Sequence, residues 1–179
     1  MPHNTIKTRQ ELTCHPSALS AFQLTQSLFR DVVLSKDPTG YSHGIDLEVD
    51  CLMMTNSGSD ESERLFVSGW YPLFSKSYSE LSTFRIVQEL EPSEIELISW
   101  RYAFHAIKVY SASNTKLAHL HIAMQACPFN IKQKILGNHY SISDIKNVAI
   151  ISGFSRGAIR SQIAYFNSNK QQLGASCYA

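Results

Sequence analysis

Apolar residues in the first part of the chain recur at intervals of three, four and seven. Pro16 and Ser17 precede this stripe, which consists of Leu19, Phe22, Leu28, Phe29, Val32 and Val33. The spacing places the apolar side chains along one side of an amphipathic helix, and we predict a helix over residues 17–35. The turn-forming residues 37–40, Asp-Pro-Thr-Gly, are expected to lie beyond its end.

Strict alternation of apolar and acidic residues replaces this pattern at residues 45–51. The apolar positions are Ile45, Leu47, Val49 and Cys51, and each position between them is acidic. A period of two predicts a strand with one buried face and one face in water. Residues 65–70 are the expected partner strand, with an exposed polar loop over 55–63. A lone hairpin is only marginally stable, so we expect the helix over 17–35 to cover it.

Helical spacing returns after residue 75. Apolar residues three apart predict a helix over 79–90, which Pro92 ends. Ser93 and Glu96 have the spacing of a capping box and predict the start of a helix that continues to residue 109. Another helix is expected over residues 114–128. The predicted fold class is therefore α+β, mostly helical, with a small N-terminal β-hairpin.

Residues 145–164 have the pattern of two helices joined by a sharp turn. Such a pair requires a small residue at the helix contact, a residue able to leave helical geometry at the turn, and apolar anchors on the second helix. In chain order these requirements are met by Ala149, Gly153, Ile159 and Ile163. Ser155 is the expected N-cap of the second helix, and residues 167–169 are expected to end it. A helix over 130–136 is predicted to close the core of this unit.

This stretch resembles the helix-turn-helix of phage-repressor and Cro-type DNA-binding proteins. Their twenty-residue pattern has alanine fifth, glycine ninth, and branched apolar residues fifteenth and nineteenth, and all four positions match when counted from Ile145. The pattern departs at Ser152, where an apolar residue is usual. It also departs at Gly157, which weakens the second helix by about 0.5–1 kcal/mol relative to alanine. The resemblance implies a C-terminal helix-turn-helix unit whose second helix lies in the major groove of DNA.

The outer face of the second helix supplies the expected contacts with DNA. Arg156 and Arg160 are four residues apart and share a face, and a guanidinium can donate two hydrogen bonds to guanine. We predict base contacts for these arginines and mainly phosphate contacts for the lysines and serines. The full set of predicted DNA-binding residues is Lys134, Lys146, Ser155, Arg156, Arg160 and Ser161. Gln162 and Ala164 lie at the margin of this face.

The charge distribution supports a polyanion-binding region near the C-terminus. The whole chain has a net charge of +1, but residues 131–170 contain six lysines and arginines against a single aspartate, and the rest of the chain is net acidic. Phosphate contacts need cations concentrated on one surface. We therefore predict an α+β body over residues 1–127, for dimerisation, partner or effector contact, and a helix-turn-helix DNA-binding unit and tail over 128–179.

The predicted function is sequence-specific binding of double-stranded DNA by a transcriptional regulator. A homodimer is expected because one such helix reads too few base pairs for useful affinity. The alternative is an adaptor or interaction protein of a mobile element or defence system, in which the helical hairpin is structural. An enzyme ranks third: residues 153–157 spell Gly-x-Ser-x-Gly, but a hydrolase elbow needs a large α/β sheet. No cofactor is expected.

Metal, membrane and export signals are weak in this sequence. His119 and His121 diverge by about 200° on a helix and cannot chelate one ion, and the four cysteines form no zinc pattern, so no metal is expected. No apolar run approaches the length of a membrane span. The polar N-terminal segment lacks the apolar core of a signal peptide, and we expect a cytoplasmic protein.

Overall fold

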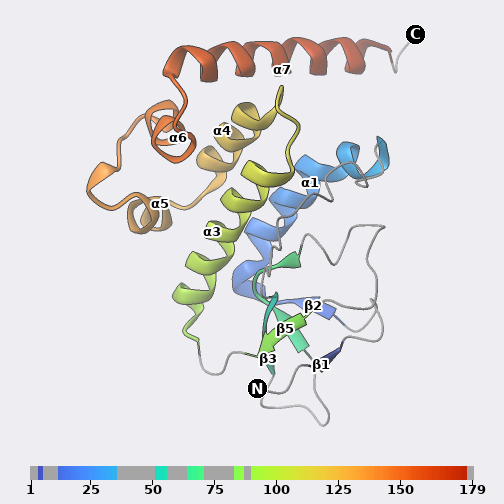
Figure 1. The fold of residues 1–179 in the computed structure, drawn as a ribbon, viewed down its shortest axis with the longest axis vertical. Helices are drawn as coiled ribbons and strands as arrows, with labels where there is room; N and C mark the ends of the chain where they lie inside the picture. The colour runs from blue at the N-terminus through green and yellow to red at the C-terminus, as the bar shows by residue number, and fades with distance from the viewer. Residues whose placement is uncertain are drawn as a thin grey trace. The chain divides into compact units, whose positions relative to one another are not determined.

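The structure, a computed structural model, describes residues 4–5, 12–35, 51–55, 64–70, 83–86 and 90–176 (Figure 1). The chain divides into two compact units, Met1–Ala103 and Phe104–Ala179, and each is described by itself. The division falls within helix α3 (Pro92–Tyr110). The predicted domain boundary between residues 127 and 128 stays a prediction, and it lies inside the second of these units.

A five-stranded sheet forms part of the first unit. Its strands are β1 (Asn4–Thr5), β2 (Leu12–Cys14), β3 (Cys51–Thr55), β4 (Arg64–Phe66) and β5 (Thr83–Ile86), arranged in the order β1-β5-β3-β4-β2. Strands β3 and β4 pair antiparallel, with Met54 opposite Leu65. The pairing is that of a hairpin, but β3 shares only Cys51 with the strand predicted over 45–51, and β4 ends at Phe66, before the end of the partner strand predicted over 65–70. The predicted sheet had too few strands, because β2 also pairs with β4 and β5 also pairs with β3, both in parallel. Residues 45–50 and 56–63 of the predicted strand and loop lie outside the described residues.

The predicted helix over 79–90 is wrong where the structure describes it. Residues 83–86 form β5, in which Phe84 pairs with Cys51 and Ile86 with Met53. The sequence Thr-Phe-Arg-Ile alternates polar and apolar residues as well as fitting a period of three, and β-branched and aromatic residues favour strands. Pairing with β1 and β3 supplies backbone hydrogen bonds that local spacing cannot reveal. The other residues of this prediction, apart from Leu90, are not described.

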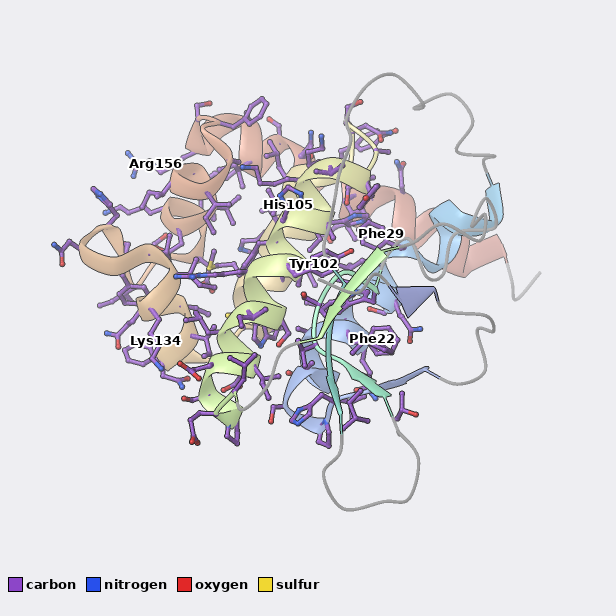
Figure 2. The ribbon with its side chains drawn as sticks, turned by 60° about the horizontal axis from the view of Figure 1, so that its bottom comes forward. Phe22, Phe29, Tyr102, His105, Lys134 and Arg156 are labelled. Atoms are coloured by element: carbon purple, nitrogen blue, oxygen red, sulfur yellow. The ribbon has the colours of Figure 1, made fainter. Side chains whose placement is uncertain are left out.

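Helix α1 (Leu19–Ser35) confirms the predicted helix over 17–35 and follows a short 3₁₀ helix, η2 (Pro16–Ala18). Its inner side contributes to an aromatic core. The ring centroids of Phe22 and Trp70 are 5.7 Å apart and those of Tyr102 and Trp70 are 4.5 Å apart, and both contacts are edge to face. Figure 2 labels Phe22 and Tyr102. The indole N–H of Trp70 donates a 2.8 Å hydrogen bond to the buried hydroxyl of Thr25. Packing of these aromatic rings, together with a hydrogen-bond partner for the buried indole N–H of Trp70, stabilises the unit.

The capping prediction for α3 is wrong by two residues. The backbone N–H of Glu91 donates to Glu94 Oε2 at 3.1 Å, so the capping pair is Glu91 and Glu94 rather than Ser93 and Glu96. Proline suits the first position of a helix because its missing N–H is one that would have no partner there. Pro92 therefore begins the helix, and Ser93 lies within its first turn.

Helices alone make up the described part of the second unit. After the end of α3, the chain forms α4 (Lys116–Ala126), α5 (Phe129–Leu136), the 3₁₀ helix η4 (Gly137–His139), α6 (Asp144–Ser152) and α7 (Arg156–Ser176). These agree with the helices predicted over 114–128 and 130–136 and with the helical pair over 145–164. Helix α4 packs against both α6 and α7. The core includes the fully buried side chains of Leu120, Ile131, Val148 and Ile159.

Helix α7 does not end at residues 167–169 as predicted but continues to Ser176. Asparagine and serine lower helix propensity by less than about 1 kcal/mol each, which does not break a helix that is already formed. Ser168 Oγ also donates a 3.0 Å hydrogen bond to the carbonyl of Ala164, so the hydroxyl is accommodated within the helix.

Candidate nucleic-acid interface

Gly153 produces the turn between α6 and α7. It adopts a left-handed conformation with φ of 75° and ψ of 5°, and its N–H donates a 2.9 Å hydrogen bond to the carbonyl of Ala149. A residue with a Cβ is disfavoured in this region, so glycine is the natural choice after the last helical residue. The chain leaves α6 at Ser152 and begins α7 at Arg156, which leaves residues 153–155 as the whole connection.

Ser155 caps α7 as predicted. Its Oγ accepts a 3.3 Å hydrogen bond from the N–H of Ala158, and its carbonyl accepts from Ile159 at 3.2 Å. Ile159 is fully buried and anchors α7 in the core of the unit. Ile163 and Ala149 are only half-buried, so the predicted packing positions are unequal.

The two glycines near this turn predict opposite effects of the same substitution. Gly153→Ala should destabilise the protein by about 1–2 kcal/mol, because alanine in left-handed geometry brings its Cβ close to the following carbonyl oxygen. Gly157→Ala should stabilise it by about 0.5–1 kcal/mol, because Gly157 lies inside a helix. Apart from the local backbone and the two chain neighbours, an added Cβ has no atom within 4 Å at Gly153 and meets only Ser155 Oγ, at 3.9 Å, at Gly157, so packing against other residues does not decide either effect. Urea unfolding followed by circular dichroism measures both, and changes of the same sign would contradict the assignment of the turn.

All of the predicted DNA-contacting residues have exposed side chains. They are Lys134 on α5, Lys146 on α6, Ser155 in the turn, and Arg156, Arg160 and Ser161 on α7. Arg156 and Arg160 are separated by about one helical turn and share one side of α7. Arg156 and Lys134 are both labelled at the left in Figure 2.

The division of charge between the two units is sharper than the division between the predicted domains. Residues 104–179 contain eight lysines and arginines against one acidic residue, which gives a net charge of +7, and residues 1–103 have a net charge of −6. The added cations of the second unit are Lys108 and Lys116. Its one carboxylate, Asp144, is bound by Lys132 Nζ at 3.2 Å. No other carboxylate side chain of this unit is present to neutralise Arg156 or Arg160.

Gln162 has a structural role that the sequence pattern did not reveal. Its Oε1 accepts a 2.7 Å hydrogen bond from the N–H of Leu117, in the first turn of α4, and its Nε2 donates to the carbonyl of Ser113 at 2.7 Å. The N-cap residue of α4, Thr115, makes no side-chain capping bond, so Gln162 satisfies part of that helix end. Gln162 follows the buried Ile159 by three residues, which is compatible with an inward side chain, but its partners lie 45 and 49 residues earlier and no local pattern marks them.

The two hydrogen bonds of Gln162 fix the rotation of α7 about its own axis. Successive helical residues are rotated by about 100°, so a residue two positions away points in a nearly opposite direction. Because Gln162 is held against α4, Arg160 is directed away from it and toward solvent. The two hydrogen bonds therefore position the arginine face as well as stabilising the unit.

His119, one of the two histidines of α4, serves packing. His119 is buried, its Nδ1 lies 3.0 Å from Ser111 Oγ, and its ring contacts Phe166 edge to face at 5.3 Å. Burial lowers the pKa of His119. Burial is also the main influence on the pKa of His121 and lowers it, while the negative charge of Asp144 acts in the opposite direction and raises it. Within the described residues, no group of three or more histidine, cysteine or acidic side chains is arranged to hold a metal ion.

Comparison of the chain with protein-family models, with curated proteins and with solved structures gave no match. The chemistry of this surface is therefore interpreted from its own residues. Among the described helices, none combines the length and the apolar content required to cross a membrane.

Proposed function

We propose that the second unit is a helix-turn-helix DNA-binding unit and that α7 enters the major groove of double-stranded DNA. The observation that carries this proposal is the exposed pair Arg156 and Arg160 at the start of α7, in a unit of net charge +7 whose one acidic side chain is already paired. Cations concentrated on one unit suit a phosphate backbone. A short helix-turn-helix connection suits entry of the second helix into a groove.

The exposed residues divide into two roles. Arg156 and Arg160 read base edges, since each guanidinium donates two hydrogen bonds to guanine O6 and N7. Lys134 and Lys146 contact phosphates, and Ser161 assists them from α7. Ser155 Oγ already accepts from the N–H of Ala158, and its O–H is the donor for a phosphate oxygen. This division of labour supports a regulator of transcription that recognises a particular sequence.

A homodimer accompanies this proposal. Two recognition helices about 34 Å apart would reach successive major grooves on one side of the duplex. The acidic body over residues 1–127 is proposed to provide dimerisation, partner contact or effector sensing, because its negative charge disfavours contact with phosphates.

Exposed apolar side chains favour the second candidate, a protein-binding adaptor. In the second unit these are Phe129, Ile142, Ile150, Phe154 and Tyr165, each between 47% and 94% exposed. Apolar groups on a surface commonly mark protein contacts when they form a continuous patch. An adaptor would use these side chains and would leave the arginines without a nucleic-acid role.

Fluorescence anisotropy with a labelled duplex of random sequence separates the two candidates. Neutralisation of two phosphates by Lys134 and Lys146 gives a slope of about −1.8 when the logarithm of the affinity is plotted against the logarithm of the salt concentration. Affinity should then fall at least about tenfold between about 50 mM and 200 mM salt. The absence of duplex binding at low salt would contradict the proposal and favour the adaptor.

A further inference from the structure

Phe154 is an exposed aromatic residue in the connection between α6 and α7. Its side chain is 54% exposed, although large apolar residues usually contribute to the core. It occupies the middle of the three-residue turn, directly before Ser155 and Arg156. Before it, Gly153 is in left-handed geometry and the N–H of Phe154 donates to Ser152 Oγ at 3.3 Å. After it, Ser155 caps α7, since its Oγ accepts a 3.3 Å hydrogen bond from the N–H of Ala158. A rigid connection therefore presents Phe154 to solvent.

The surroundings of Phe154 favour nucleic acid as its partner. The nearest charged residues along the chain are Lys146 and Arg156, both exposed cations, and the unit's one acidic residue is paired with Lys132. The first turn of α7 is also unobstructed, because Gly157 has no side chain and a Cβ there would meet only Ser155 Oγ, at 3.9 Å. A polyanion can approach this end of the helix closely.

The major groove offers one apolar group to such a side chain. The C5-methyl group of thymine projects into the groove, whereas the other base edges present hydrogen-bond donors and acceptors. We propose that Phe154 packs against a thymine methyl group and thereby specifies thymine at one position next to the bases read by the arginines. This inference rests on the proposed DNA binding and adds a specificity-determining residue to it.

The test compares thymine with deoxyuridine, which lacks only the methyl group. Duplexes selected by the wild-type protein from a random pool are resynthesised with deoxyuridine at each thymine in turn. Loss of one buried methyl contact should weaken wild-type binding about fourfold at one position. Phe154→Ala should bind the thymine and deoxyuridine duplexes equally, and Phe154→Leu should keep part of the difference. Circular dichroism confirms that each variant folds.

Two control variants make the result specific. Ile142→Ala removes an apolar side chain that is 94% exposed but lies outside the turn, and it should keep the full difference between the duplexes. Arg160→Ala should bind both more weakly and also keep their difference. Equal wild-type binding at every thymine, or a difference that survives in Phe154→Ala, would overturn the inference and leave the DNA-binding proposal standing. Absence of any salt-dependent duplex binding would overturn both.

Discussion

Arg160→Ala should lower the preference for a selected duplex over a random duplex by about 5-fold to about 150-fold, since a bidentate guanine contact contributes about 1–3 kcal/mol of discrimination. Lys134→Ala should instead weaken both duplexes alike and reduce the magnitude of the salt slope by about one. Both side chains are exposed, so neither substitution removes a core residue. Competition binding followed by anisotropy measures the ratio directly.

The contrast between these two variants is the informative quantity. Arg156→Ala should behave as Arg160→Ala does, because the two guanidinium groups share one side of α7. Replacement of each arginine by lysine retains the charge but loses the two-pronged donor, and should retain most of the affinity for random duplex. Identical effects of Arg160→Ala and Lys134→Ala on the two duplexes would refute the separation of base and phosphate contacts.

Ile159→Ala should destabilise the second unit by about 2–5 kcal/mol, because it removes a fully buried branched side chain and leaves a cavity. The matched control is Ile163→Ala, one helical turn later on α7, whose half-buried side chain should cost clearly less. Urea unfolding monitored by circular dichroism gives both values. Equal losses for the two variants would contradict the burial that anchors α7.

Helices were the part of the fold that sequence predicted best. The chain marks their ends with residues of clear geometric effect, such as Pro128 before α5 and Gly153 after α6. Between these helix ends, apolar residues spaced three and four apart indicate a helix without reference to residues distant in the chain. The start of α3 was misplaced because Ser93 is a common capping residue, while the decisive residue was Pro92 at the first helical position.

Strands and long-range polar contacts were harder to predict. Residues 83–86 satisfy both a strand and a helix pattern, and pairing with β3, about 30 residues earlier in the chain, decides between them. Gln162 shows the same limit for a single side chain. Its partners Ser113 and Leu117 precede it by more than 40 residues, so no local pattern marks the contact.

The candidate site was predictable in its residues but not in its orientation. Spacing alone placed Arg156 and Arg160 on one side of a helix, and both are exposed as expected. The reason that this side faces outward is the pair of hydrogen bonds made by Gln162, together with the buried Ile159. Exposure of Phe154 also required the structure, because an aromatic residue beside a turn is equally consistent with burial.

Mapping the duplex-binding surface by amide chemical shifts of the full chain tests the central claim most directly. On titration with duplex DNA at low salt, the largest shifts should lie in residues 153–161, with further shifts near Lys134 and Lys146. The side of α4 that Gln162 contacts should change little, because it faces the core of the unit. Shifts confined to residues 1–103, or the absence of shifts in residues 153–161 when the duplex is bound, would contradict the account.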